Sequence, residues 1–316
     1  MVTGGAGFIG SNLIEHFIKE NRVVCLDNLI TGNKENIQPF LTNRHFEFIE
    51  GDIRNLENCV NAVKGVDVVL HHAALGSVPR SIENPLNTNE HNITGFLNIL
   101  EAARKVGVKR VIYASSSSVY GDDETFPKIE DETGNPLSPY AVTKVANELY
   151  ARVYADLFGM ELIGLRYFNV FGKNQDPAGS YAAVIPKFIS RLTEGKEITV
   201  YGDGTQSRDF THVANVVRAN DLAASSTDAN AINQVYNVAY GATTSLNDLV
   251  ELIITLLAEI EIEVNRKLIV SGSLRKGEIK DSFADIGKIT KNLAYSPVVT
   301  LEEGLRKTIP LYTGRK

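Results

Sequence analysis

The sequence predicts an α/β protein in which a doubly wound parallel sheet fills the first half and a smaller α/β domain follows. Three observations predict this. Short apolar runs alternate with helical patterns, a glycine-rich turn stands at the start, and small or polar residues gather where the apolar runs end. In a parallel sheet the carboxyl ends of the strands meet at one edge, which is where ligand-binding loops lie.

Five apolar runs predict strands, and helical patterns lie between them. The expected strands are 22–27, 45–50, 66–71, 108–114 and 160–167, and the expected helices are 8–19, 56–63, 92–105 and 139–158. Only Met1 and Val2 precede the glycine-rich turn, although a central first strand is normally several residues longer. Either the start is truncated or mis-assigned, or this strand is unusually short.

After residue 168 the loops lengthen, and Gly and Pro become more frequent. Helical patterns continue at 185–194, 213–225, 245–258 and 301–309. We therefore expect residues 1–168 to form the first domain. Residues 169–316 would form mainly the second domain, with 213–240 returning to the first.

Composition excludes several classes of protein. The 316 residues are 43% hydrophobic, enough for a large core, and the formal net charge is −6. This charge indicates no attraction to nucleic acid or to membranes, and no apolar run is long enough to span a bilayer. Without the charged-then-apolar pattern of a secretion leader, we expect a cytoplasmic protein. Cys25 and Cys59 match no metal or redox spacing and are expected to be buried thiols.

The opening turn has the spacing of a dinucleotide-binding loop. Gly4, Gly7 and Gly10 are three residues apart, and the expected helix begins at Phe8 and Ile9. The glycines permit a tight turn and a close approach of the backbone to a pyrophosphate, which lies at the positive end of the helix. By itself this pattern is weak, because a plain strand–helix connection can also contain glycines.

Asp27 strengthens the nucleotide interpretation, because it ends the next strand about twenty residues on, where an acid binds the adenosine ribose. Its charge would repel a 2′-phosphate, and Asn28 follows it rather than an arginine, so NAD is favoured over NADP. Asp52 and Ile53 end the third strand and are expected beside the adenine. Ala73 and Ala74, after the fourth, would let backbone lie against the cofactor.

His71 and His72 are adjacent, which raises the possibility of a metal site. Neighbouring residues of a strand point to opposite faces of the sheet, so the two side chains cannot readily bind one ion. We therefore expect no metal.

Two further patterns indicate acid–base chemistry. Tyr140 and Lys144 lie four apart at the start of an expected helix and so share one face. A lysine ammonium there favours the phenolate, so the tyrosine pKa is expected to fall and the residue to act as a general base. The serine cluster Ser115–Ser118 ends an apolar strand about twenty residues earlier. Alone, the first pattern is typical of a solvated helix face and the second of a polar turn.

With these motifs in order, the chain resembles the extended short-chain dehydrogenase/reductases over essentially its whole length. Within them it resembles the nucleotide-sugar 4-epimerases, most closely those acting on UDP-N-acetylglucosamine. Further motifs that carry the resemblance are Asn92, Leu165–Asn169, Gly202–Phe210 and Arg275–Glu278. The resemblance implies a Rossmann-type NAD-binding domain, a second domain for a UDP-sugar, and a homodimer paired through helices 92–105 and 139–158.

The resemblance also implies roles for individual residues. Tyr140 matches the base, Ser116 the serine that binds the reacting hydroxyl, and Lys144 the residue at the nicotinamide ribose. Asn92 and Tyr167 join the cofactor set. The implied substrate residues are Gly76, Ser77, Ser116, Ser117, Asn169, Ala183, Val184, Lys187, Tyr201, Arg208, Arg275, Glu278 and Ser282. The two arginines are expected to clamp the diphosphate, because guanidinium groups bind phosphates bidentately.

The choice of sugar is expected to depend on Ser282, which matches the position bordering the C2 substituent. A tyrosine there excludes an N-acetyl group, whereas serine leaves room for it. Serine does not forbid the smaller sugar, since poor filling costs only about 1–3 kcal/mol. The resemblance thus implies C4 epimerisation of UDP-N-acetylglucosamine, and also of UDP-glucose.

Three alternatives remain open: a UDP-glucuronate 4-epimerase, another NAD-dependent nucleotide-sugar enzyme such as a dehydratase or decarboxylase, and a non-catalytic nucleotide sensor. The dehydratases carry an Asp-Glu pair where Ser117 and Ser118 stand, and the decarboxylating relatives a Glu at the Ser118 position. A sensor would be expected to lack Tyr140 and Lys144.

Overall fold

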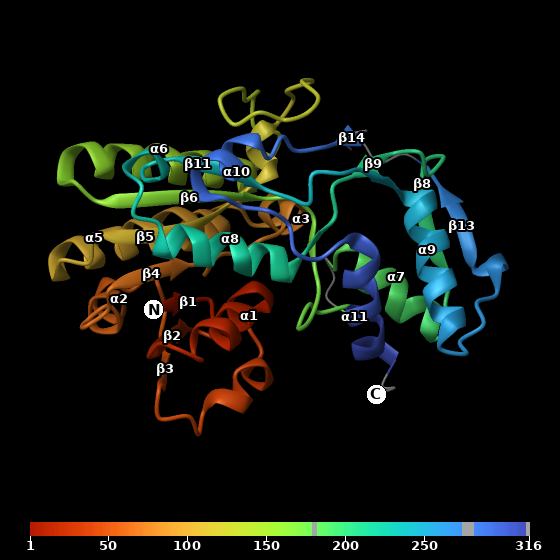
Figure 1. Ribbon diagram of the computed structural model, residues 1–316, viewed down its shortest axis with the longest axis horizontal. Coiled ribbons are helices and arrows are strands. Elements are labelled where there is room, and N and C mark those ends of the chain that lie inside the picture. The colour runs from red at the N-terminus through yellow and green to blue at the C-terminus, as the bar shows by residue number, and fades with distance from the viewer. Residues whose placement is uncertain (179–181, 274–280, 314–316) are drawn as a thin grey trace.

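The computed structural model describes residues 1–178, 182–273 and 281–313, which form two parts lying side by side along the long axis of the molecule (Figure 1). The larger part contains a seven-stranded sheet in the order β11-β6-β5-β4-β1-β2-β3, with every neighbouring pair parallel. The strands are β1 (Val2–Thr3), β2 (Val23–Asp27), β3 (Phe46–Glu50), β4 (Val68–His71), β5 (Arg110–Ser116), β6 (Glu161–Tyr167) and β11 (Val235–Val238). The expected α/β class with a Rossmann-type sheet is confirmed.

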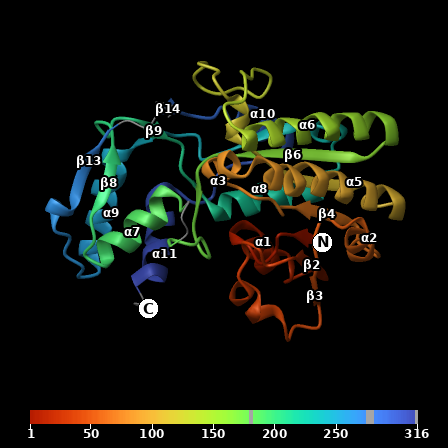
Figure 2. The same cartoon turned by 180° about the vertical axis from the view of Figure 1, so that it is seen from behind.

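Helices cover both faces of this sheet, so its central strands are buried on both sides, whereas the edge strand β3 is partly exposed. One face carries α1 (Phe8–Phe17), α8 (Val213–Ser225) and α10 (Gly287–Leu293), as Figure 1 shows for α8 and α10. The other carries α2 (Leu56–Ala62), α5 (Gly95–Val106) and α6 (Pro139–Phe158), of which α5 and α6 are seen in Figure 2. α8 and β11 belong to this part although they follow residue 168.

The expected helix at 92–105 begins earlier, through short elements that the sequence analysis did not predict. These are α3 (Val78–Glu83), α4 (Pro85–Asn89) and a π turn at Glu90–Thr94 that leads directly into α5. Asn84 caps α4 by accepting a hydrogen bond from the Asn87 N–H at 3.1 Å, and Pro85 occupies the first helical position. Both features favour a helix start there.

Helix α6, which carries Tyr140 and Lys144, has the predicted bounds because its end signals are strong. The Ser138 hydroxyl accepts a hydrogen bond from the Ala141 N–H at 3.1 Å, and Pro139 follows it. At the other end Gly159 adopts φ +62°, a left-handed conformation that closes a helix.

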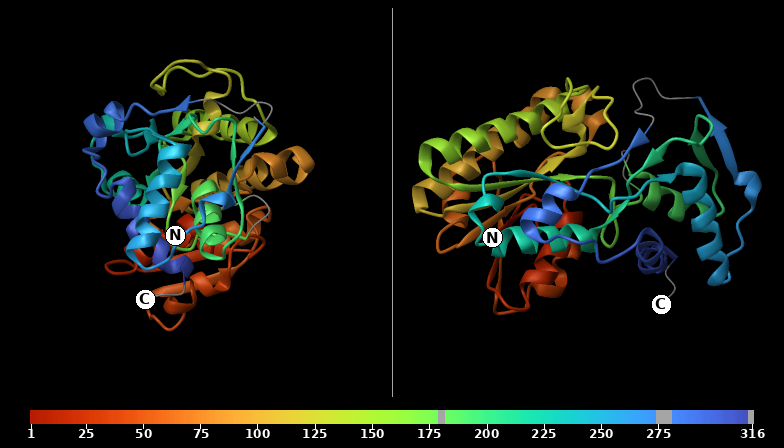
Figure 3. Two further views of the ribbon diagram at one scale, coloured as in Figure 1. Left: turned by 90° about the vertical axis from the view of Figure 1, so that its right-hand side faces the viewer. Right: turned by 45° about the horizontal axis from the view of Figure 1, so that its top comes forward.

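The smaller part has its own apolar core, formed by α7 (Val184–Thr193), α9 (Leu246–Glu259) and α11 (Leu301–Thr313) around β8 (Ile198–Tyr201). Its strands are short, and Figure 3 shows this part beside the end of the large sheet. The pairs are β8 with β13 (Ile269–Gly272), β7 (Val170–Phe171) with β10 (Thr211–His212), and β9 (Ser207–Arg208) with both β12 (Thr244–Ser245) and β14 (Asp281–Ser282). Within the described residues, no helix is long and apolar enough to cross a membrane.

A buried ion pair joins α6 to β6. The Arg166 guanidinium donates to both Glu148 oxygens at 2.9 and 2.8 Å, and Glu148 also accepts from the Ser115 hydroxyl at 2.5 Å. Arg166 is 4% exposed. Each charge therefore depends on its partner, because an unpaired charge at this depth is costly.

We predict that Glu148→Ala lowers the free energy of unfolding by about 3–5 kcal/mol, because it leaves the Arg166 guanidinium buried and unpaired. Urea unfolding measures the loss. Glu302→Ala is the matched control, since the Glu302–Arg306 pair is exposed and its removal should cost less than about 1 kcal/mol. Similar small losses in both variants would contradict a dependence of the fold on the buried pair.

Candidate active site

A cavity of about 500 Å³ lies at the carboxyl ends of the sheet strands. Its lining includes these residues of the predicted site: Gly4, Gly7, Phe8, Ile9, Gly10, Asp27, Asn28, Ile53, Ala73, Ala74, Gly76, Ser77, Ser116, Tyr140, Lys144 and Tyr167. Residues from the first glycine turn to the end of β6 thus surround one space, as expected of a parallel sheet.

The glycine turn is tight enough to require glycine at two positions. Gly4 has φ +68°, and a Cβ there would lie 2.7 Å from the Ala73 nitrogen. A Cβ on Gly10 would lie 2.1 Å from the Gly4 oxygen. No side chain therefore covers the backbone at these positions near the start of α1, and its N–H groups can approach a pyrophosphate.

Asp27 ends β2 and is hydrogen-bonded to the glycine turn. Its carboxylate accepts hydrogen bonds from the Ala6 N–H at 2.9 Å and the Leu29 N–H at 2.8 Å, and it is 7% exposed. Burial raises the pKa of this carboxyl, and the two backbone donors oppose that effect. An acid held in place at the end of β2 fits a ribose hydroxyl, as predicted for NAD.

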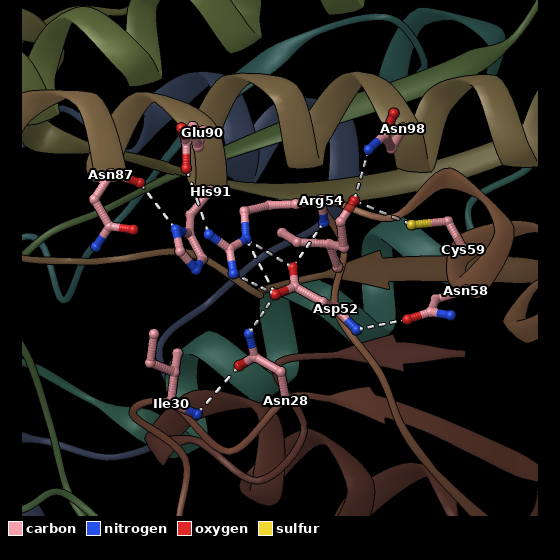
Figure 4. Close-up of polar contacts among 11 residues, drawn as sticks. Asn28, Ile30, Asp52, Arg54, Asn58, Cys59, Asn87, Glu90, His91 and Asn98 are labelled. Carbon is pink, nitrogen blue, oxygen red and sulfur yellow. Dashed lines mark hydrogen bonds and ion pairs between the residues drawn. The ribbon is translucent and has the colours of Figure 1, made fainter.

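Asp52, predicted beside the adenine, lies just outside the cavity lining and is joined to it through Asn28. Its carboxylate accepts hydrogen bonds from the Arg54 backbone and guanidinium at 2.7–3.1 Å and from the Asn28 amide at 3.1 Å (Figure 4). Arg54 holds the pKa of Asp52 at about 2. The ionised Asp52 carboxylate therefore holds Asn28 of the cavity lining and Arg54 in place through hydrogen bonds.

Asn92 also lies outside the lining and acts on it indirectly. Its amide oxygen accepts from the Leu75 N–H at 2.8 Å, and its amide nitrogen donates to the Leu75 carbonyl at 3.2 Å and to the Thr143 hydroxyl at 3.1 Å. Thr143 precedes Lys144 on α6. Asn92 thereby fixes the loop after β4 against the helix of the predicted base.

Ser116, Tyr140 and Lys144 meet at the cavity. Ser116 lies near enough to Tyr140 to lower the pKa of its hydroxyl, and the Lys144 ammonium lies 5.9 Å from the centre of the Tyr140 ring. Lys144 Nζ donates to the Ala114 carbonyl at 2.7 Å, which fixes its position at the end of β5. The geometry is that of a proton-transfer site with a cation beside the phenol.

The predicted lowering of the Tyr140 pKa is not met by the protein chain alone. Burial raises the pKa of the Tyr140 hydroxyl, and the neighbouring Ser116 opposes that effect. Burial also lowers the pKa of Lys144 to about 8, and the ammonium form still predominates at pH 7. In a desolvated site the cost of the phenolate exceeds the help from one ammonium, and a further positive charge is needed.

The two adjacent histidines point to different partners. The His71 Nδ1 lies 2.8 Å from the Thr3 hydroxyl, and the His72 Nε2 lies 2.7 Å from the Tyr167 hydroxyl. Burial lowers the pKa of both rings to about 3, so both are neutral. The Tyr167 hydroxyl also accepts from the Asn220 amide at 2.8 Å, which ties β6 to α8.

The predicted substrate residues are brought together in part. Strand pairing places Ser282 opposite Arg208, and both are half-buried. Asn169 has φ +35° and donates to the Asp209 carbonyl at 3.2 Å, next to Arg208. Ala183, Val184 and Lys187 lie at the start of α7, Tyr201 ends β8 and Ser117 follows β5, all outside the cavity lining. Arg275 and Glu278 lie outside the described residues.

The sequence analysis missed some residues of the lining, among them Thr31, Arg80 and His91. Arg80 lies on the unpredicted α3 and His91 in the π turn. Proximity of His91 to Asn92 in the sequence was the available signal, although a lone histidine in a helix is more often a core residue.

The site fits a dinucleotide on structural grounds. The glycine turn at the start of α1 has room for a pyrophosphate, and the hydrogen-bonded Asp27 carboxylate can bind the adenosine ribose. The cavity continues to Tyr140 and Lys144, where the nicotinamide ring would lie.

Comparisons agree with this geometry. The model of the NAD dependent epimerase/dehydratase family matches residues 1–239. The UDP-N-acetylglucosamine 4-epimerase of Methanobrevibacter ruminantium, solved with UDP-N-acetylmuramic acid, is 39% identical with a TM-score of 0.91, covering 99% of this chain and 97% of that one. The UDP-glucose 4-epimerase of Thermotoga maritima, solved with UDP-glucose, is 35% identical with a TM-score of 0.90, covering 99% and 98%.

A UDP-glucuronate 4-epimerase of Thermodesulfobacterium geofontis is 34% identical over 319 residues, covering 98% of this chain and 94% of its own. The resemblance predicted from the motifs is confirmed: the chain belongs to the NAD dependent epimerase/dehydratase family and is an NAD-dependent isomerase of the 4-epimerase type.

Proposed function

We propose that this protein inverts C4 of UDP-sugars and that its main reaction interconverts UDP-N-acetylglucosamine and UDP-N-acetylgalactosamine. The observation that carries the proposal is the meeting of Ser116, Tyr140 and Lys144 at the end of the dinucleotide cavity. The three relatives described above are each named for a UDP-sugar, which supports the substrate class.

In this mechanism Tyr140 takes the proton of the sugar 4-hydroxyl and later returns it, while Ser116 holds the same oxygen by a hydrogen bond. Bound NAD supplies hydride acceptance and return at C4, and its oxidised ring carries a positive charge. That charge adds to the Lys144 ammonium, so the pKa of Tyr140 would fall only in the loaded enzyme. Tyr140 would therefore become an effective proton acceptor only when the oxidised cofactor is bound.

Inversion requires the sugar to present its other face while the nucleotide stays fixed. We assign the fixing to Arg208, Asn169 and the predicted Arg275, because guanidinium groups hold phosphate oxygens bidentately. In a protein with a net charge of −6, such cations must be placed locally. Tyr201 and Glu278 are proposed to bind the uridine, and Val184 and Lys187 to lie beside it.

Ser282 supports the choice of an acetamido sugar. It is half-buried on β14 opposite Arg208, and its small side chain leaves space beside the proposed diphosphate position. Other small residues are proposed to line the sugar pocket, namely Gly76, Ser77, Ser117 and Ala183. A hydrophobic or acidic substitution at any of these would change the accepted sugar by filling or charging the pocket.

The serine cluster weighs against elimination and decarboxylation. Ser117 and Ser118 form a short 3-10 turn after Ser116, and the Ser118 N–H donates to the Ser116 hydroxyl at 3.1 Å. No carboxylate stands at these positions, so no acid or base is available there for a second proton transfer. UDP-glucuronate remains the second candidate substrate, supported by the Thermodesulfobacterium relative.

We also propose a homodimer through α6 and the neighbouring helix. Val142, Leu149, Val153 and Leu157 are apolar side chains of α6 that are 45–69% exposed. A row of exposed apolar residues along one long helix is typical of a protein–protein contact.

The reaction is tested by incubating the purified protein with UDP-N-acetylglucosamine, UDP-glucose and UDP-glucuronate separately, with and without added NAD. We predict that NMR of the first mixture shows UDP-N-acetylgalactosamine forming at the highest rate, with no net NADH. Turnover of UDP-glucuronate alone would show that the acetamido assignment is wrong.

We predict that Tyr140→Phe lowers kcat by about 10²–10⁴-fold, because the phenol oxygen carries the proton transfer. The dissociation constant for UDP-sugar should stay within a few-fold of wild type, since the ring is retained. Steady-state kinetics and calorimetry measure the two quantities. A near-normal kcat would remove Tyr140 as the base.

We predict that Ser282→Tyr abolishes turnover of UDP-N-acetylglucosamine and spares UDP-glucose, because the ring fills the space of the acetamido group. Ser282→Ala is the matched control and should leave both rates within a few-fold. The kcat/KM ratio of the two sugars is the measurement. Equal activity on both sugars in the tyrosine variant would contradict the role of Ser282.

A further inference from the structure

A second cavity of about 500 Å³ lies where the two parts of the molecule meet. Helices α1 and α8 of the larger part and α11 of the smaller part contribute to its wall (Figure 1). None of its described lining residues also lines the cavity of the active site, and no step proposed above uses it. The paired strands β7 and β10 have a residue in each wall: Val170 lines the first cavity and His212 the second. The second cavity is therefore a separate space next to the active site.

Four cationic side chains line this cavity against two carboxylates, although the formal net charge of the protein is −6. The cations are Lys19, Lys173, Arg218 and Lys307, and the carboxylates are those of Glu15 and Asp221. Lys173 is paired with Glu15 at 2.8 Å, and Arg218 with Asp221 at 3.4 Å. The two remaining lysines give the cavity a surplus of positive charge, which favours an anionic ligand.

The ammonium groups of Lys19 and Lys307 have no ion-pair partner in the part of the chain that the structure describes. Both residues are exposed. Glu303, one turn before Lys307 on α11, accepts hydrogen bonds from the N–H and the hydroxyl of Thr300 at 2.9 and 3.1 Å instead. The two ammonium groups can therefore turn toward a bound ligand.

His212 is a buried polar residue of this wall. It is 7% exposed, and its ring packs edge-on against Phe171 with the ring centres 5.3 Å apart. Its Nδ1 accepts a hydrogen bond from the Ala214 N–H at 3.2 Å, so in the neutral ring Nε2 carries the proton. Burial lowers the pKa of His212 to about 4, and the ring is therefore neutral at pH 7. No described residue accepts a hydrogen bond from Nε2.

Two glycines leave room for this ring and fix its place. A Cβ on Gly304 of α11 would lie 2.9 Å from His212 Cδ2, and a Cβ on Gly172, after β7, would lie 3.4 Å from Nε2. A donor held without an acceptor costs free energy, so such an N–H in the wall of a cavity indicates that a ligand supplies the acceptor. Because Nε2 can only donate, this atom also suits an anion.

Apolar side chains form another part of the wall. α8 contributes Val213 and Val217, and Val298 and Leu311 add apolar side chains of residues that are 59% and 54% exposed. Val213 begins α8, so the positive end of the helix dipole adjoins the cavity. A volume of about 500 Å³ lies in the range of small-molecule sites and exceeds what a phosphate ion alone would fill. The wall therefore fits a ligand with both an apolar body and an anionic group.

We propose that this cavity is a second ligand site, which binds a phosphate monoester with an apolar body. The phosphate would accept the hydrogen bond from His212 Nε2 and lie beside the ammonium groups of Lys19 and Lys307. The body would lie on the valines of α8. A phosphate monoester carries about two negative charges at pH 7, which balances the surplus of cations in the lining. Since α8 belongs to the larger part and Lys307 to the smaller, the ligand would contact both parts at once.

The test measures binding of phenyl phosphate and of inorganic phosphate to the NAD-loaded full chain by ³¹P NMR titration. We expect phenyl phosphate to bind with a dissociation constant of about 1 mM, as befits so small a ligand. Inorganic phosphate should bind at least about tenfold more weakly, because it leaves the apolar wall uncovered. No binding of phenyl phosphate, or equal binding of the two anions, overturns the proposal.

Variants locate the site. Lys307→Gln removes an exposed cation and should weaken phenyl phosphate about fivefold, and Lys64→Gln, an exposed lysine after α2, is the matched control that should change nothing. His212→Asn keeps an acceptor that can cap α8 and loses the Nε2 donor, so binding should weaken about tenfold. Arg208→Gln, in the proposed diphosphate clamp, should leave binding unchanged. Binding that survives in Lys307→Gln and His212→Asn, or that is lost in Arg208→Gln, would place the anion elsewhere and refute the site.

Discussion

The side-chain amide of Asn92 connects the parts of the molecule that the chemistry needs together. It satisfies both backbone groups of Leu75 in the loop after β4 and donates to Thr143 on α6, and it is 1% exposed. Thr143 in turn donates to the Tyr140 carbonyl at 2.7 Å. Removing the amide would leave buried donors and acceptors unpaired, at about 1–3 kcal/mol each. The loop against the cofactor and the helix of the proposed base therefore keep one relative position.

The sheet and its main helices could be predicted because their signals are local. The apolar run of β2 is buried at every residue, and α6 has a serine cap, a proline and a closing glycine. The elements that were missed are short. β11 has four residues and holds its place by pairing with β6, and α3 and α4 have start signals at Ser77 and Asn84 but only six and five residues, too few to show a helical apolar period.

The site was predictable where backbone geometry dictates the residue type. A Cβ has no room at Gly4 or Gly10, so the glycine spacing alone marks the turn. The place of Asp52 beside the adenine stays a prediction, and its pairing with Arg54 could not be predicted because side-chain packing selects that partner and sequence spacing does not report it. The raised pKa of Tyr140 in the protein chain alone could not be predicted for a related reason: spacing shows that Lys144 is near, but desolvation is a property of the folded site.

The π turn explains how one short segment serves both the scaffold and the cavity. His91 and Asn92 are consecutive and both almost fully buried. His91 lines the cavity, whereas Asn92 is hydrogen-bonded to Leu75 and Thr143. In a regular helix, consecutive residues diverge by about 100° and one of the pair commonly faces away from the core. An i to i+5 turn widens the helix locally, and such turns are frequent at functional sites. Here the wider turn lets Asn92 contact α6 while the adjacent His91 lines the cavity. The hydrogen bonds that hold Asn92 against α6 therefore also fix the position of His91.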